Sequence, residues 1–162
     1  MVKKPDRQNI CNAGEYYIAS ILSANGFTVT LTLGRAEKYD IIAINPNGKS
    51  IKLQVKTLYG DWIQWRMSPK NEKVGDKDLF YAFVRLNDLK KEPEYWVVPS
   101  NVVAKYIKCT HSKWLATPRR DGTPHPKDYS GRAFRVKSDR NTPKDWTEHC
   151  KQFKSNIKQL LK

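Results

Sequence analysis

The chain has 162 residues, of which 39% are hydrophobic and 28% charged, and its formal net charge is +14. This length suits one domain with its own core, and the composition excludes an intrinsically disordered chain. No apolar run approaches the roughly 20 residues of a membrane-spanning helix, and the N-terminus lacks the apolar core of a signal peptide. Three cysteines, Cys11, Cys109 and Cys150, lack the spacing of a disulfide framework. They indicate reduced thiols and a cytoplasmic protein.

The positive charge is concentrated toward the C-terminal end. Residues 1–104 carry 15 basic and 11 acidic side chains, whereas residues 105–162 carry 15 basic and only 5 acidic ones. Such an excess favours binding to polyanions, because each phosphate contact releases condensed counterions. We therefore expect the last third of the chain to make much of the contact with a nucleic acid. A merely basic surface is the alternative.

The first half of the chain predicts one helix and three strands. Residues 1–8 are polar and basic, which is typical of a flexible arm. From Asn9 to Asn25 the apolar residues share one helical face, and Gly26 is a suitable residue to end that helix. Strands are expected at Phe27–Leu33, Tyr39–Ile44 and Ser50–Tyr59. The intervening sequence Asn45-Pro46-Asn47-Gly48 predicts a tight turn, so the last two strands should form a hairpin.

The second half predicts a sheet completed by further strands and two helices. Strands are expected at Asp61–Ser68, Leu79–Leu86, Tyr95–Val98 and Ala133–Lys137. One helix should begin at Pro99-Ser100, and a long loop should occupy residues 116–132. Thr142-Pro143 predicts the start of a helix that runs to the end of the chain. The predicted class is α/β, with a mixed β-sheet flanked by helices.

Three polar residues of the predicted hairpin are candidates for chemistry. Counting back from the turn places Asp40 near residue 53 or 54, while Gln54 and Lys56 lie on the polar side of the partner strand. A carboxylate, an amide oxygen and an ammonium at one point of a sheet suit phosphodiester hydrolysis, because hard oxygen ligands hold Mg²⁺ and a lysine offsets phosphate charge. The alternative is that Gln54 and Lys56 form the solvated face of an amphipathic strand.

Glu15 is a further candidate, on the first predicted helix. It lies at the edge of the apolar stripe, so its carboxylate should be partly buried when the helix packs. A partly buried carboxylate requires a partner such as a metal ion or a lysine. The alternative is a first-turn acid that the helix dipole favours.

Residues 12–58 resemble the core of the PD-(D/E)XK nuclease superfamily. The resemblance rests on Gly14-Glu15 in a helix, Gly26-Phe27, Tyr39-Asp40-Ile41-Ile42-Ala43 before a turn, and Ile51-Lys52-Leu53-Gln54-Val55-Lys56. It implies a restriction-endonuclease-like fold, as found in restriction enzymes, Holliday-junction resolvases and some small homing endonucleases. Together with the length and charge, it predicts one nuclease domain over residues 1–162, with a flexible arm at 1–8, a catalytic core at 9–98, and helices and a basic loop for DNA contact at 99–162.

The resemblance implies a metal-dependent DNA endonuclease. Asp40, Gln54 and Glu15 match the positions that hold Mg²⁺, for which Mn²⁺ can substitute, and Lys56 matches the motif lysine. The implied partner is double-stranded DNA. Members of the family usually act as homodimers or higher homo-oligomers, and we expect this chain to associate through its aromatic strands. No membrane and no organic cofactor are expected. Gln54 stands where the family usually has an acid, so a binding-only protein on the same fold stays an alternative, as does an RNase.

Candidate DNA-binding residues are the basic side chains of the long loop and of the last predicted helix. They are Arg119, Arg120, Lys127, Arg132, Arg135, Lys151, Lys154 and Lys158. Trp62 and Trp65 are expected to pack against the sheet, with stacking on bases as the alternative. Cys109 with His111, and His149 with Cys150, do not match the spacing of a zinc finger or knuckle, so no zinc is expected.

Overall fold

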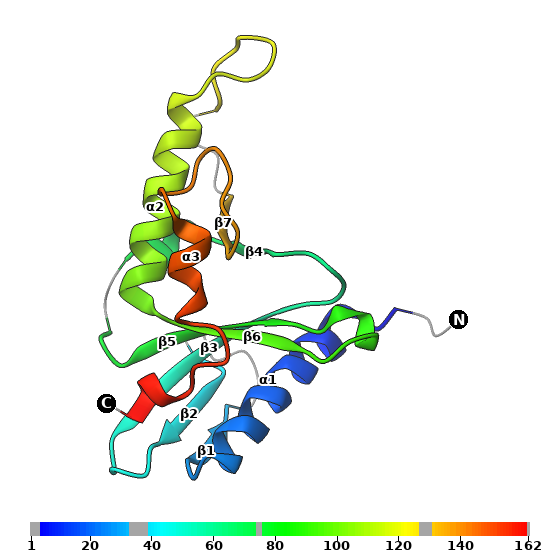
Figure 1. Cartoon of the computed structure of the whole chain (residues 1–162), viewed down its shortest axis with the longest axis vertical. Coiled ribbons are helices and arrows are strands. Elements are labelled where there is room, and N and C mark those ends of the chain that lie inside the picture. Colours follow the sequence, from blue (N-terminus) through cyan, green and yellow to red (C-terminus); the bar gives the residue numbers. More distant parts are fainter. Residues whose placement is uncertain (1–3, 33–38, 74–75, 127–130, 162) are drawn as a thin grey trace.

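A five-stranded mixed sheet forms the centre of the computed structural model, which describes residues 4–32, 39–73, 76–126 and 131–161 (Figure 1). Its strands are β1 (Thr28–Leu31), β2 (Ile41–Ile44), β3 (Ser50–Leu58), β5 (Leu79–Arg85) and β6 (Glu94–Pro99). They lie in the order β1-β2-β3-β5-β6. The β3–β5 pair is parallel and the other three pairs are antiparallel. The predicted α/β class with a mixed sheet is confirmed.

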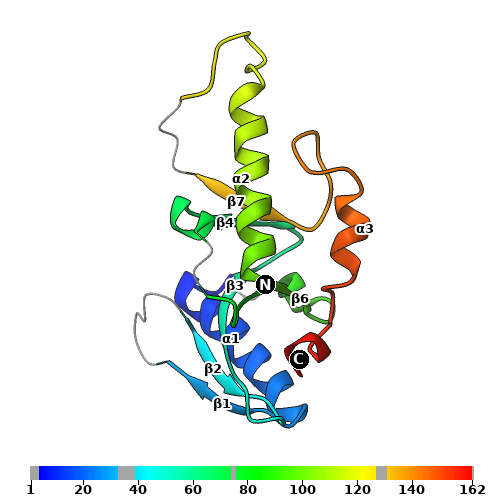
Figure 2. The same cartoon turned by 90° about the vertical axis from the view of Figure 1, so that its left-hand side faces the viewer.

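Helices and a separate β-ribbon flank this sheet (Figures 1 and 2). The helices are α1 (Arg7–Ala24), α2 (Ser100–Ala116) and α3 (Trp146–Lys151), with short 3-10 turns η1 (Pro69–Glu72), η2 (Asn87–Leu89) and η3 (Lys158–Leu161). The ribbon pairs β4 (Gln64–Met67) with β7 (Arg132–Arg135) in antiparallel fashion. None of the described helices has the length and apolar character needed to span a bilayer.

Local signals explain the N-terminal helix and the hairpin. Asp6 caps α1, because its carboxylate accepts a hydrogen bond from the Asn9 N–H (2.8 Å), so the helix starts at Arg7, earlier than predicted. In the β2–β3 turn the Asn45 side chain accepts hydrogen bonds from two turn N–H groups. Gly48 supplies a left-handed residue (φ +82°) there. The predicted hairpin is present.

Two hydrophobic clusters cover the two faces of the sheet. On one face, α1 contributes Ile18 and Leu22 to a cluster built around strand residues such as Leu53. On the other face, the cluster is rich in aromatic residues, namely Trp65, Tyr81, Phe83, Trp96, Tyr106, Phe134, Trp146 and Phe153. Tyr81, Phe83 and Trp96 of β5 and β6 are buried in this internal core, so these side chains are not exposed for the subunit contact expected of the aromatic strands.

The last predicted helix is wrong in both its start and its length. Thr142 does not cap a helix; its hydroxyl donates to the Asp139 carbonyl (2.7 Å) and closes a turn. Asp145 has a left-handed backbone (φ +56°), so α3 begins only at Trp146. The helix ends at Lys151 because the chain then pairs with the free edge of β6, where the Val97 N–H donates to the Phe153 carbonyl (3.0 Å).

Candidate active site

Asp40 lies immediately before the first residue of β2. Its backbone N–H donates to the Leu53 carbonyl (2.9 Å), and its Oδ2 accepts a hydrogen bond from the Val55 N–H (2.6 Å). These two bonds hold the carboxylate beside β3 at the level of Gln54, in the neighbourhood expected from the turn. Burial raises the pKa of Asp40, and the Val55 N–H and the Lys56 charge only partly offset this.

Gln54 and Lys56 point away from the core that α1 covers. Along β3, Ile51, Leu53 and Val55 are buried, whereas Gln54 and Lys56 are half-buried. Neither polar side chain makes a hydrogen bond or ion pair within the described residues. The Gln54 amide and the Lys56 ammonium are therefore available to a ligand. Because both are half-buried, they do not form the fully solvated strand face that was the alternative.

Glu15 reaches this site because α1 packs very closely on β3. Gly14 faces Thr57, and a Cβ at Gly14 would lie 1.9 Å from Thr57 Oγ1, so only glycine allows this approach. The next residue, Glu15, is half-buried without a hydrogen-bond partner among the described residues. Burial raises its pKa first, the Asp40 charge raises it further, and Lys56 lowers it. The charges of Asp40 and Lys56 therefore both act on the Glu15 carboxyl group.

Sequence reasoning did not include Cys11 in this group. Burial raises the pKa of the Cys11 thiol, and the charges of Arg7, Glu15, Lys56 and Asp40 also act on it. Its position four residues before Glu15 places both on one face of α1, and this spacing was the signal available in the sequence.

The donor set fits a hard divalent cation. Two carboxylates and an amide are oxygen ligands, and Mg²⁺ binds through one or two carboxylates while keeping several waters. The Asp40 charge raises the pKa of Glu15 because the two carboxylates repel each other. A bound cation would reduce this repulsion. Among the described residues there is no group of three or more His, Cys, Asp or Glu side chains placed to hold a metal ion. An ion here would therefore depend on the Gln54 amide as well as on the two acids.

The candidate DNA-binding residues do not form one group. Arg119 and Arg120 are exposed in the turn that follows α2. Figure 1 shows the segment after α2 at the far end of the projection that this helix makes. Lys127 lies outside the described residues. Arg132 and Arg135 are on β7, where they pair with Glu72 and Asp139 respectively.

The three lysines of the C-terminal segment do not line one helix face. Lys151 ends α3 and pairs with Glu148 (2.7 Å). Lys154 lies in the segment that pairs with β6, where it contacts Glu94 (2.5 Å). Lys158 is exposed in η3. Their separation follows from the break in the predicted helix.

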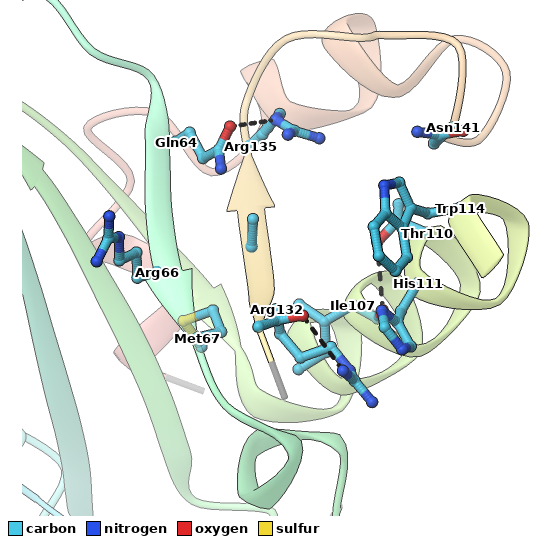
Figure 3. Close-up of a pocket in the computed structure, with 12 residues that line it drawn as sticks. Gln64, Arg66, Met67, Ile107, Thr110, His111, Trp114, Arg132, Arg135 and Asn141 are labelled. Carbon is cyan, nitrogen blue, oxygen red and sulfur yellow. Dashed lines mark hydrogen bonds between the residues drawn. The ribbon is translucent and has the colours of Figure 1, made fainter. Parts of the chain in front are cut away.

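A groove next to the β4–β7 ribbon was missed by the sequence reasoning (Figure 3). It has a volume of about 430 Å³, with one wall from the ribbon and the other from α2. The lining residues are Gln64, Arg66, Met67, Ile107, Thr110, His111, Trp114, Gly131, Arg132, Ala133, Arg135 and Asn141. The available signal was the alternation Gln64-Trp65-Arg66-Met67, in which polar and buried residues take turns.

The tryptophans near the ribbon behave differently from each other. Trp65 is 1% exposed, and its indole N–H donates to the Val84 carbonyl (3.1 Å), so it packs on the sheet as predicted. Trp62 is 73% exposed, and the expectation that it covers the sheet is wrong. Its neighbours explain this, because Gly60-Asp61 interrupt the strand before the ribbon begins.

Comparison with known proteins supports the fold. No protein-family model matches the sequence, and no curated protein sequence matches it significantly. The structure is similar to that of a bacterial homing endonuclease, I-Ssp6803I, with a TM-score of 0.53 and 15% sequence identity. The similarity covers 98% of this chain and 93% of the other. At this identity the likeness shows a shared nuclease-like α/β fold.

Proposed function

We propose that the chain is a DNA endonuclease that hydrolyses phosphodiester bonds with the help of a divalent metal ion, Mg²⁺ or Mn²⁺. The observation that supports this proposal is that the charges of Asp40 and Lys56 act on Glu15 while the Val55 N–H holds Asp40 beside β3, within a nuclease-like fold. The order of these residues along the chain fits the PD-(D/E)XK pattern, with Gln54 at the second acidic position.

In this proposal Glu15, Asp40 and Gln54 hold the metal ion. When bound, such an ion neutralises charge on the scissile phosphate and promotes ionisation of water. The Val55 N–H holds the Asp40 carboxylate in place for this role. Lys56 orients the attacking water and donates to phosphate oxygens as negative charge gathers on them. Its half-buried position strengthens these interactions relative to those of a lysine in bulk water.

Cutting both strands of a duplex requires two such sites, so we propose that the active form is a homodimer or a higher homo-oligomer. Positive charge beyond the sheet supports duplex DNA as the substrate. The last 58 residues carry most of the net charge of +14, and Arg119 and Arg120 are exposed in the segment that follows α2.

The test is a nicking assay on supercoiled plasmid with Mg²⁺ or Mn²⁺, comparing wild type with Lys56→Ala. We expect the variant to lose at least about 100-fold in nicking rate while it keeps its affinity for DNA. Lys49→Ala is the matched control, because Lys49 lies on the same hairpin but pairs with Asp78 (3.0 Å) at the surface. Equal nicking by wild type and Lys56→Ala would refute the proposed site.

A binding-only protein is the second candidate, and Gln54 is the observation that favours it. An amide in place of a carboxylate removes one negative charge and weakens metal binding. This candidate predicts tight, salt-sensitive binding to DNA without cleavage by any metal ion. An RNase would use the same site, and preferential cleavage of RNA in a parallel assay would identify it.

A further inference from the structure

We infer that the β4–β7 ribbon reads base edges in the major groove of DNA, with Gln64, Arg66 and Arg135 as its specificity-determining residues. This inference rests on the proposed function, because it names the part of the DNA that a second surface of the protein contacts. It concerns residues that lie outside the candidate active site.

The shape of the ribbon suits the groove. A two-stranded antiparallel ribbon fits a major groove about 12 Å wide, which a larger sheet does not enter. Within the described residues the ribbon has only its two strands, and no backbone ladder joins it to the five-stranded sheet. Figures 1 and 2 show it beside α2, outside the main sheet.

The inner face of the ribbon fixes it rigidly to the body. The Phe134 ring stacks on Phe83 with centroids 4.2 Å apart, and Trp65 contacts the same ring at 5.2 Å. The Trp146 indole N–H also donates to the Arg135 carbonyl (2.7 Å), so α3 holds β7 from the other side. Recognition of bases requires such a rigid support, because the side chains must keep a defined geometry.

The outer face presents side chains that hydrogen-bond to bases. Gln64 and Arg66 are exposed, and Gln64 is the ladder partner of Arg135. The Arg135 Nε–H donates to Gln64 Oε1 (2.9 Å), and its guanidinium also contacts Asp139 (2.6 Å). Arginine pairs in a bidentate manner with guanine, and glutamine with adenine, in the major groove. The two residues are therefore placed side by side before any DNA binds.

The charge of the protein groove between the ribbon and α2 favours bases over phosphates as the contact. None of its lining residues is acidic, but Glu72 pairs with Arg132 and Asp139 pairs with Arg135. Such pairing reduces the attraction for phosphates while it orients the guanidinium groups. Arg66 makes no hydrogen bond or ion pair within the described residues. It is the free bidentate donor of the ribbon.

The experiment is selection of bound duplexes from a randomised library with Ca²⁺ present, for wild type, Arg66→Lys and Arg135→Lys. Lysine keeps the charge but loses the bidentate fork. We expect each variant to lose between about 5-fold and 150-fold of base discrimination at one or more positions. Affinity for random-sequence duplex should stay within about 2-fold, because the number of charges is unchanged. Arg140→Lys, an exposed arginine that does not line the groove, is the matched control.

Base preferences in Arg66→Lys and Arg135→Lys that equal those of wild type would overturn the inference. A wild type without any base preference, or an A-form RNA duplex that competes as well as DNA, would overturn it too, because the RNA major groove does not admit a ribbon. Binding alone is measured, so loss of the proposed cleavage activity leaves the result interpretable. Conversely, if the protein cleaves DNA but Arg66→Lys and Arg135→Lys keep the base preference of wild type, only the role of the ribbon is refuted.

Discussion

Lys56 and Phe83 are direct partners in the parallel ladder between β3 and β5. The Phe83 ring in turn carries Phe134 and Trp65, the two aromatic anchors of the β4–β7 ribbon. The lysine of the proposed active site and the ribbon thus share one rigid attachment on the same face of the sheet. In the proposed function, this attachment would keep a fixed distance between the bases that the ribbon contacts and the phosphate that the active site cuts.

Gln54→Glu tests whether position 54 is a metal ligand. We expect the affinity for Ca²⁺ or Mg²⁺ to rise about 10-fold, because a third carboxylate joins Glu15 and Asp40. Without metal the variant should be less stable by about 1 kcal/mol, since the pKa values of both neighbouring acids are already raised. Calorimetric titration and unfolding in a chelator measure the two effects. Gln152→Glu, at the exposed end of α3, is the control that should change neither.

The raised pKa values of Glu15 and Asp40 also predict how metal binding depends on pH. Protons compete with the cation for both carboxylates, so metal affinity should fall as the pH is lowered. The fall should begin at a higher pH than for carboxylates with ordinary pKa values. A metal affinity that stays constant down to the ordinary pKa range of Asp and Glu would contradict the assignment of these ligands.

Gly14→Ala tests the close approach of α1 to β3. The new methyl group would meet the Thr57 side chain at 1.9 Å, so the helix must move outward. We expect a loss of about 2 to 3 kcal/mol in the free energy of unfolding, measured by denaturant titration. Ser20→Ala, on the exposed side of the same helix, should have little effect. Partial recovery in the Gly14→Ala/Thr57→Gly double variant would assign the loss to this one contact.

Trp65→Ala should destabilise the protein far more than Trp62→Ala. Trp65 is fully buried against Phe83 and Trp96, so its removal should cost about 3 to 5 kcal/mol. Trp62 is largely exposed, and its removal should change stability by less than about 0.5 kcal/mol. Thermal unfolding of both variants measures the difference, and equal losses would show that Trp62 packs against the body.

The part of the fold that could be predicted is the part that local signals determine. The β2–β3 hairpin follows from its Asn-Pro-Asn-Gly turn, and α1 from its apolar periodicity. The neighbourhood of Asp40 and Gln54 follows from counting along that hairpin, because a tight turn sets the register.

The parts that could not be predicted depend on contacts distant in sequence. Trp146, Phe153 and Ile157 have helical spacing, yet they serve two different clusters on opposite faces of the sheet. The chain reaches both faces only by leaving the helix and crossing the edge of β6. The pairing of β4 with β7 joins segments about 70 residues apart, and no local pattern indicates it.

Glu94 supplies the clearest prediction for the pH dependence of stability. Burial would raise its pKa, but hydrogen bonds from Lys154 (2.5 Å) and from Arg85 outweigh this and lower the pKa to about 2, from an ordinary value of 4.5. The folded state therefore favours the charged form. Its stabilising contribution is fully present above about pH 4.5 and is lost as the pH falls toward about 2.

Glu94→Gln should therefore destabilise the protein by about 1 to 2 kcal/mol at neutral pH, and the difference from wild type should shrink on acidification. Because Lys154 lies in the segment that pairs with β6, the Ser155 amide should also exchange its hydrogen faster; it donates to the Tyr95 carbonyl (3.0 Å). Glu148→Gln, which breaks only the exposed pair with Lys151, should show neither effect. A destabilisation by Glu94→Gln that is the same at neutral pH and at about pH 2 would mean that packing, rather than charge, holds this edge of the sheet together.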